Sequence, residues 1–395
     1  MHATFPKKPR DDWDFIEVLQ DSPSSADEDV KVDDSAMRTS SAAPAPRTAL
    51  SKGELALAGY LLARTVDGRV VTPEQIERHQ RASETVEQVR DTLQWGRCNV
   101  TRDLQETDHA NFRVNAAWRA HFRANQLEGR STSRAVQAAA SVAAKTGMCT
   151  EYALASHYLH LDRLKAGESI AIVGAGNKAD SHLWAVLTHG DSGHRLVLDA
   201  WGEGPPIDAA DAKFMKPSTP RSILMETDHE KAGEEKAAFE AGLNEHVPHR
   251  QDEVERRRSQ YERVGNRMPR KFQREPLPII RKSFAKRARA EIDSVAMPRG
   301  GKLSPREVKI REVALGIVGK VSGAARRHLG ELQSAKNATR EANVALAVTT
   351  AKALGADDAL ARSMAGDIIE RARDLRRVGP SRVKPEFRVP DRRKA

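Results

Sequence analysis

The chain contains little cysteine, few aromatic residues and no long apolar run. Its 395 residues include two cysteines, Cys98 and Cys149, which excludes a disulfide framework and favours a reducing working compartment. No apolar stretch approaches the length of a membrane span, and no signal peptide with an apolar segment opens the sequence. The start Met1-His2 lacks the glycine that N-myristoylation requires. We therefore expect no transmembrane segment, no disulfide scaffold and no myristoyl anchor.

Charge is abundant but unevenly distributed. Apolar residues make up 39% of the chain and charged residues 30%, which predicts a globular part with solvated flanks. Residues 250–289 hold 14 Lys and Arg against 5 Asp and Glu, and so account for most of the net charge of +10. This stretch could bind nucleic acid, an anionic membrane or an import receptor, but a solvated charged helix is the simpler interpretation. No aromatic pattern in it argues for base stacking, so we predict no specific nucleic-acid partner.

Composition changes divide the chain into six parts. Capping boxes begin helices at Ser51 and Ser304, and Thr72-Pro73 begins another. The predicted parts are a disordered Ser/Pro/Ala-rich leader over 1–49, a helical subdomain over 50–130, a catalytic core over 131–225, a basic charged helical and linker region over 226–300, a helical region over 301–380 that stops at Gly379-Pro380, and a disordered tail over 381–395.

Three motifs within the core carry side chains suited to nucleophilic catalysis. Cys149 lies in Gly147-Met148-Cys149-Thr150-Glu151-Tyr152-Ala153, where a glycine-containing turn opens a helix over 149–165. His182 lies in Ser181-His182-Leu183-Trp184-Ala185-Val186-Leu187, within a strand over 181–188. Asp199 lies in Leu196-Val197-Leu198-Asp199-Ala200-Trp201, within a strand over 194–200. A thiol on a helix followed by an imidazole and a carboxylate on strands is the arrangement of papain-like and transglutaminase-like sites.

Each residue type has a role in such a site. A helix N-terminus favours the thiolate of Cys149, because its free N–H groups and dipole attract negative charge. The imidazole of His182 would accept the thiol proton and return it to the leaving group. Asp199 would fix the imidazole tautomer and stabilise the imidazolium. The backbone N–H of Cys149 would be one oxyanion donor, and the sequence does not identify a second.

The two strands are joined by a hairpin whose register can be tested by arithmetic. If Leu187 faces His194, then His182 faces Asp199 directly, because opposed residues in an antiparallel pair share one number sum. A slip of two residues keeps His182 and Asp199 on one face as diagonal neighbours, whereas a slip of one separates them. We therefore expect the two side chains to share a face.

Simpler interpretations compete with each assignment. Cys149 could be a small core residue, and Cys98 could be the nucleophile, although no helix begins directly after it. Trp95, Arg97 and Asn99 could line a cleft that holds substrate or cofactor, or could form an ordinary structured loop. Two further features argue for no site: the hairpin sequence Gly190-Asp191-Ser192-Gly193, which lacks the fold that a serine nucleophile would need, and the histidines His157, His160, His189 and His194, which lack the spacing of metal ligands.

The three motifs, with Gly202 after the last one, resemble the AvrPphE/HopX/XopE (RipE-like) family of type III effectors, which plant-pathogenic bacteria inject into host cells. The resemblance covers roughly residues 50–225. It implies an α+β fold with a papain-like or transglutaminase-like core, a Cys149-His182-Asp199 triad, a helical N-terminal subdomain and a helical C-terminal extension. It also implies that a region preceding the cysteine, here 59–118, serves target or cofactor recognition, and that a host plant protein is the substrate.

These features lead to one expected function and one rival. We expect a type III secreted effector that performs thiol acyl transfer on host proteins, as a protease, deamidase or transglutaminase, in the host cytoplasm or nucleus. We predict no bound metal and no resident cofactor, although a host factor could bind near the Trp95–Asn99 loop. The leader would carry the secretion signal and could bind a secretion chaperone. The rival is an effector that binds a host target without chemistry.

Overall fold

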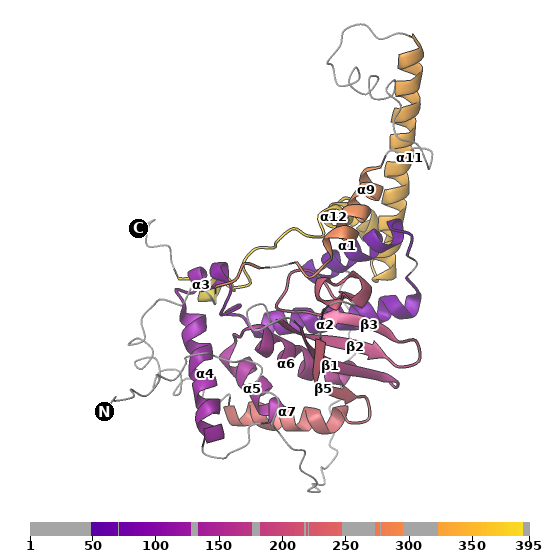
Figure 1. Ribbon diagram of the computed structural model, residues 1–395. Coiled ribbons are helices and arrows are strands. Elements are labelled where there is room, and N and C mark those ends of the chain that lie inside the picture. Colours follow the sequence, from indigo (N-terminus) through magenta and orange to yellow (C-terminus); the bar gives the residue numbers. More distant parts are fainter. Residues whose placement is uncertain are drawn as a thin grey trace, which may run out of the picture.

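The computed structural model describes residues 49–69, 71–127, 133–175, 182–216, 219, 221–246, 273–276, 278–294 and 323–389. It combines helices with one antiparallel sheet, which confirms the predicted α+β class (Figure 1). The predicted leader lies outside these ranges except for its last residue, Ala49. None of the described helices is long and apolar enough to cross a membrane.

The described elements follow in chain order. The α-helices are α1 (Lys52–Val66), α2 (Pro73–Thr92), α3 (Thr101–Glu106), α4 (Ala110–Leu127), α5 (Arg134–Ala144), α6 (Cys149–His160), α7 (Ala232–His246), α9 (Lys282–Asp293), α11 (Gly323–Ala353) and α12 (Asp358–Arg373). The strands are β1 (Glu168–Ala175), β2 (His182–His189), β3 (His194–Leu198), β4 (Ile207–Asp208) and β5 (Arg221–Asp228). Short 3-10 helices are η2 (Leu161–Arg163), η3 (Ala209–Asp211), η4 (Lys213–Met215) and η6 (Pro385–Phe387).

The five described strands form a single sheet in the order β4-β3-β2-β1-β5. Every neighbouring pair is antiparallel, and β5 returns to the far edge beside β1. Sequence patterns predicted β2 and β3 but missed the edge strands β4 and β5. The missed edge strand β5 is mostly solvent-facing, with Ile223 64% exposed, so it lacks the apolar content that marks a buried strand.

Helices cover both faces of the sheet, and residue alternation assigns each strand side chain to one of them. Ile170 and Ile172 of β1 pack in a core with α2, α5, α6 and α7. Ala171 and Val173 pack in a second core with α1, α9, α11 and α12. The period of two along the strand is the reason why adjacent residues enter different cores. The sheet is therefore a central layer, with α6 on one face and α1 on the other.

The β2–β3 hairpin has a register two residues away from the predicted one. His189 pairs with His194 and Leu187 with Leu196, so the expected pairing of Leu187 with His194 is wrong. The slip is even, and an even slip leaves every side chain on its predicted face. His182 and Asp199 are therefore diagonal neighbours on one face, which confirms that they share a face.

Helix α1 packs against helices from the other end of the chain. Buried residues of α1 share one core with α9, α11 and α12, and a methyl group at Gly59 would come within 2.5 Å of Arg371 Cβ on α12. The predicted boundaries, which placed α1 in a 50–130 subdomain and α12 in a separate 301–380 region, are therefore wrong for this pair. Local patterns predict helices but not which distant helix covers them. Figure 1 shows these four helices grouped at one end of the molecule, with α11 projecting beyond it.

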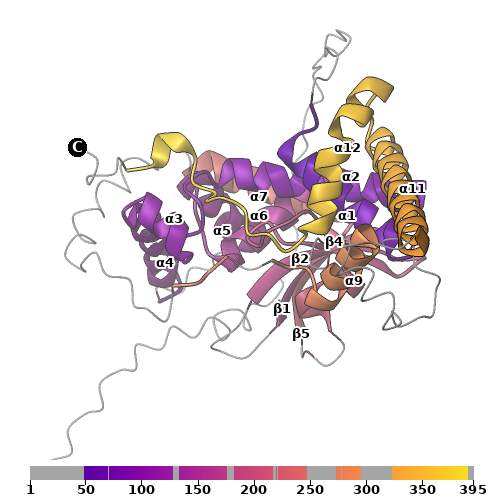
Figure 2. The ribbon, with the colours of Figure 1, turned by 90° about the horizontal axis from the view of Figure 1, so that it is seen from above.

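Two extended segments cross the molecule. Residues 377–389 run from α12 to α3, as the yellow chain in Figures 1 and 2 shows, where Arg102 donates a hydrogen bond to Gly379 O and Val389 N–H donates to Glu106 O. The prediction of a disordered tail over 381–395 is wrong for 381–389, because these specific bonds order a polar segment. The second segment comprises residues 273–276 and 278–281, where Arg274 N–H donates to Asn99 O and Arg281 N–H donates to Asp211 O.

Phe284 anchors α9 in the core beneath α1. Its ring is 1% exposed, lies 6.0 Å from the Tyr60 ring in an edge-on arrangement, and has the Arg69 guanidinium 4.6 Å from its centroid. We expect Phe284→Ala to lower the free energy of unfolding by about 3–5 kcal/mol, because it leaves a cavity in a closed core. The check is the urea unfolding midpoint.

The matched control is Lys286→Ala on the solvent side of the same helix, which should change the free energy of unfolding by less than about 0.5 kcal/mol. Equal midpoints for the two variants would show that α9 is not anchored through Phe284.

Candidate active site

A tight turn between α5 and α6 places Cys149 at the first position of its helix. Lys145 ends α5 in the left-handed conformation with φ of 57°, and Met148 N–H donates to Glu151 Oε2 at 2.8 Å. Gly147 is required here, because an added Cβ would lie 2.3 Å from Glu151 Cβ. The first N–H groups of α6 have no acceptor within the helix, so Cys149 lies at the positive end of its dipole.

The Cys149 thiol is buried but surrounded by groups that favour its ionisation. Only 8% of the residue is exposed. Burial opposes the charged form, but the hydrogen bond and charge of His182, the Leu183 N–H and the charge of Arg274 outweigh it, so the pKa of Cys149 lies below its usual value. The structure therefore supports a reactive thiolate at Cys149.

His182 connects Cys149 to Asp199. Its Nε2 lies 2.7 Å from Asp199 Oδ2, and its Nδ1 has no hydrogen-bond partner among the described residues, so this atom is free to take the thiol proton. Burial alone would lower the pKa of His182, but the carboxylate of Asp199 and the contact with Cys149 raise it to about 10. The pKa of Asp199 is lowered despite burial, because it accepts from the imidazolium and from Gly202 N–H at 2.9 Å. The structure thus brings all three predicted triad residues together.

Three aromatic rings enclose the imidazole. The ring centroid of His182 lies 5.6 Å from Trp184, 5.1 Å from Trp201 and 4.8 Å from Phe214. These faces exclude water and stabilise a positive imidazole ring by cation–π attraction. Strand alternation could have assigned Trp184 to the face of His182, whereas nothing in the sequence indicates Phe214, which arrives from η4.

Arg97 has a structural position instead of the predicted one in a cleft. Its guanidinium is completely buried, with Nε 2.7 Å from Asp103 Oδ2 and Nη1 3.0 Å from Glu203 Oε1. It also donates to the carbonyl of Trp201 at 3.1 Å. The prediction that Arg97 lines a ligand cleft is therefore wrong, because its donors are committed to buried carboxylates. Its role is to hold the turn that follows Asp199.

The other residues of the predicted ligand loop lie in different surroundings. Trp95 is half-buried and packs against Phe387 with tilted rings, whose centroids are 5.0 Å apart, and it contacts no triad residue among its described ring partners. Asn99 lies next to the site, because its Oδ1 accepts from Trp201 Nε1 at 3.0 Å. Cys98 between them is completely buried, and burial raises the pKa of its thiol well above the usual value. Cys98 therefore lacks the ionisation that a nucleophile needs.

The remaining histidines have local partners. His157 and His160 are completely buried beside Thr227 and Thr85, and burial lowers both pKa values to about 3. His194 bonds Asp208, and His189 bonds Ser192 in the hairpin turn. Within the part of the chain that the structure describes, no group of three or more His, Cys, Asp or Glu side chains could hold a metal ion.

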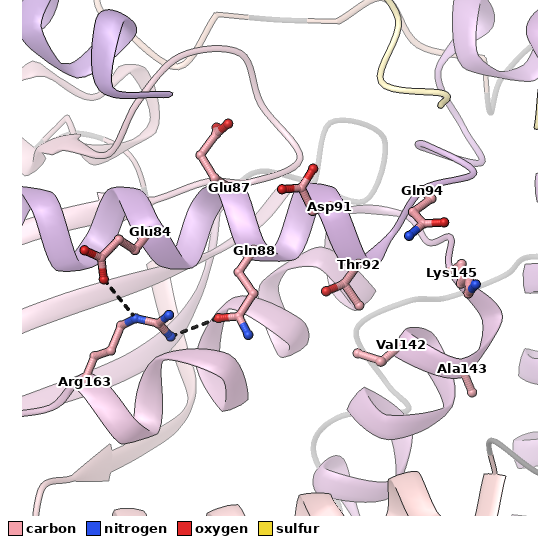
Figure 3. Close-up of a pocket in the computed structure, with 10 residues that line it drawn as sticks. All are labelled: Glu84, Glu87, Gln88, Asp91, Thr92, Gln94, Val142, Ala143, Lys145 and Arg163. Atoms are coloured by element: carbon pink, nitrogen blue, oxygen red, sulfur yellow. Dashed lines mark hydrogen bonds and ion pairs between the residues drawn. The ribbon is translucent and has the colours of Figure 1, made fainter. Parts of the chain in front are cut away.

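A groove of about 680 Å³ lies apart from the triad residues, between α2 and the end of α5 (Figure 3). Acidic side chains from α2 dominate its wall, and Arg163 bonds Glu84 and Gln88 across one end. The lining residues are Glu84, Glu87, Gln88, Asp91, Thr92, Gln94, Val142, Ala143, Lys145 and Arg163. No triad residue contributes to it, so the triad and not this groove defines the candidate active site.

No protein-family model, no curated protein and no solved structure matches this chain. The chemistry of the site is therefore inferred from its own geometry.

The two cysteines should differ in reactivity as their surroundings dictate. With a lowered pKa at Cys149 and a pKa of about 10 at His182, the thiolate–imidazolium pair is the favoured state between those values, and deprotonating His182 above about pH 10 removes its cation. We expect iodoacetamide to alkylate Cys149 about tenfold or more faster than Cys98 at pH 7. Mass spectrometry of the two peptides over a time course measures both rates.

Asp199→Asn should move the onset of Cys149 alkylation to higher pH, because the imidazolium loses its carboxylate partner. Asp191→Asn, the same change in the exposed hairpin turn, should leave the profile unchanged. Identical profiles for the two variants would contradict the coupling.

Gly147→Ala should destabilise the start of α6, because the new methyl group displaces the Glu151 side chain from Met148 N–H. The matched control is Gly366→Ala, in the middle of α12 with nothing within 4 Å of an added Cβ, which should stabilise the protein by about 0.5–1 kcal/mol. Thermal unfolding of both variants tests the difference. A rise in stability for Gly147→Ala would show that the turn tolerates a side chain.

Proposed function

We propose that this chain is a thiol acyl-transfer enzyme with Cys149 as nucleophile, His182 as general acid and base, and Asp199 as the group that orients His182. The observation that carries the proposal is the 2.7 Å contact between His182 Nε2 and Asp199 Oδ2, with His182 Nδ1 left unpaired and His182 close enough to lower the pKa of Cys149. A helix that begins at the cysteine, a strand that begins at His182 and an antiparallel neighbour that ends one residue before Asp199 support a papain-like or transglutaminase-like core.

The reaction would proceed in two acyl-transfer steps. The Cys149 thiolate attacks an amide carbonyl carbon, and the carbonyl electron pair moves to oxygen. The tetrahedral intermediate collapses to a thioester, and the departing amine or ammonia takes the proton from the His182 imidazolium. His182, now neutral, accepts a proton from the incoming acceptor as the thioester is cleaved. Asp199 stays ionised throughout and stabilises each imidazolium state.

The acceptor determines the reaction type. Water as acceptor gives proteolysis or deamidation, and an amine gives transglutamination. The triad serves all three outcomes, because the acceptor is chosen by the surrounding cleft. From the resemblance to AvrPphE/HopX/XopE effectors we propose host plant proteins as substrates, reached in the host cytoplasm or nucleus after type III secretion. A host factor that binds near the partly exposed Trp95 would be an additional requirement and not part of the chemistry.

A second function, target binding without chemistry, is favoured by the burial of the site. The exposed fractions of Cys149, His182 and Asp199 are 8%, 2% and 3%, so a substrate carbonyl must displace covering chain to reach the thiol. Arg274 is one residue of such a cover, because its N–H donates to Asn99 O beside the site and its charge acts on Cys149.

Cys149→Ala should abolish any modification of host proteins, because it removes the nucleophile while leaving a side chain that fits the same space. The test incubates wild type and variant with plant leaf extract and a fluorescent primary amine. Mass spectrometry then detects new N-termini, glutamine-to-glutamate conversion or incorporated amine.

Cys98→Ala is the matched control, since it removes the other buried thiol, and it should retain the modification. Modification by Cys149→Ala at the wild-type level would refute the mechanism. A full biological effect of Cys149→Ala in plant tissue would favour the binding function instead.

A further inference from the structure

The loop Arg97–Val100 runs alongside the start of α6. Arg97 and Gly147 form a parallel bridge, and Cys98 N–H donates to Gly147 O at 3.0 Å. Asn99 and Cys149 each follow this bridge by two residues, Asn99 in the turn that ends at Val100 and Cys149 at the first position of α6. The bridge therefore brings a neutral side-chain amide into the neighbourhood of the proposed nucleophile.

One hydrogen bond determines which way the Asn99 amide faces. Trp201 Nε1 can only donate, so the Asn99 atom 3.0 Å from it is the oxygen Oδ1. The amide nitrogen Nδ2 therefore lies on the opposite side of the group. Within the described chain no hydrogen bond engages Nδ2, although the residue is only 5% exposed. Oxyanion stabilisation requires N–H donors that are fixed in position and have no other acceptor, and the Asn99 amide meets both conditions.

Both partners of Asn99 also lie near the reacting pair. The Trp201 ring lies 5.1 Å from the His182 ring. Arg274, whose N–H donates to Asn99 O at 2.8 Å, is close enough for its charge to lower the pKa of Cys149. Asn99 is therefore fixed at its main chain and at its side chain by groups that surround Cys149 and His182.

Other unpaired donors nearby are less suitable. Trp184 Nε1 and Tyr152 Oη have no hydrogen-bond partner among the described residues, but both atoms are enclosed by the core. A substrate carbonyl cannot reach them without opening that core. Asn99 lies instead in a loop, where it is bonded by Arg274 from a distant part of the chain.

We propose that Asn99 Nδ2 is the second oxyanion donor, acting together with the backbone N–H of Cys149. The assignment rests on the proposed acyl-transfer function. As the C–S bond forms, the carbonyl π pair becomes a lone pair on oxygen, and the two N–H groups stabilise that negative charge. The pair returns to carbon when the leaving group departs with the proton of His182. Asn99 is thus a catalytic residue, in contact with the reacting oxygen.

Two probes separate oxyanion stabilisation from thiol activation. p-Nitrophenyl acetate acylates a thiolate through a tetrahedral oxyanion and releases p-nitrophenolate, and water then hydrolyses the acetyl thioester. Iodoacetamide alkylates the same thiolate by displacement of iodide, without an oxyanion. Rates with both probes are measured across pH for the full chain and compared at their high-pH plateaus, which removes any effect of a variant on the pKa of Cys149.

The variants are Asn99→Asp and Asn99→Ala. Asn99→Asp keeps an oxygen acceptor for Trp201 but has no N–H, whereas Asn99→Ala loses both. We expect acylation to fall about 10²-fold or more in each variant, while the plateau alkylation rate stays within a few-fold of wild type. Urea unfolding of Asn99→Asp close to that of wild type would show that the Trp201 contact is kept.

Two results would overturn the assignment. Acylation of Asn99→Asp at the wild-type rate would show that its N–H is not used. An equal fall of acylation and alkylation would show that Asn99 only positions Trp201 and His182. The proposed function fails in a different way: wild type would then react with both probes no faster than Cys149→Ala.

Discussion

The site depends on one buried ionic junction, at Arg97. Its guanidinium joins the loop before Cys149 to the turn after Asp199, through Asp103, Glu203 and the carbonyl of Trp201. Removing one member of a buried pair leaves an uncompensated charge, which costs about 3–5 kcal/mol. The ion pair therefore holds together two loops that are distant in the sequence, since Arg97 and Glu203 lie 106 positions apart. This clamp fixes the turn that follows Asp199 relative to the loop Arg97–Val100.

The chemistry of the thiol is set by a balance between burial and charge. Burial raises the pKa of both cysteines, yet the outcome is opposite at the two positions. Cys98 has Glu151 nearby, whose negative charge adds to the effect of burial. Cys149 has His182, Leu183 N–H and Arg274, which together reverse it. Low exposure then strengthens each of these interactions, because little water is present to screen them.

Local rules predicted the parts of the site and missed what assembles them. The helix start placed Cys149, and strand alternation placed His182 and Asp199 on one face. The even slip of the hairpin did not change that face, so all three residues could be assigned from sequence. Contacts between distant segments leave no such pattern. The packing of α1 on α12 and the order of residues 381–389 were therefore predicted wrongly, and Phe214 was not anticipated. The sequence singled out Arg97 as a candidate binding residue. Its position in the sequence could not show whether its guanidinium binds a ligand or a buried carboxylate.

The crossing segment 377–389 has a consequence for how the molecule is assembled. Ser381 Oγ donates to Asp103 and Arg382 to Gly202 O, so the clamp around Arg97 is completed by residues close to the end of this chain. The triad itself comes from one contiguous stretch, and a ribosome delivers that stretch well before residues 381 and 382. A growing chain therefore carries the thiol, the imidazole and the carboxylate without their last support. The arrangement around Arg97 is therefore finished only once residues 381 and 382 have been made and have folded back.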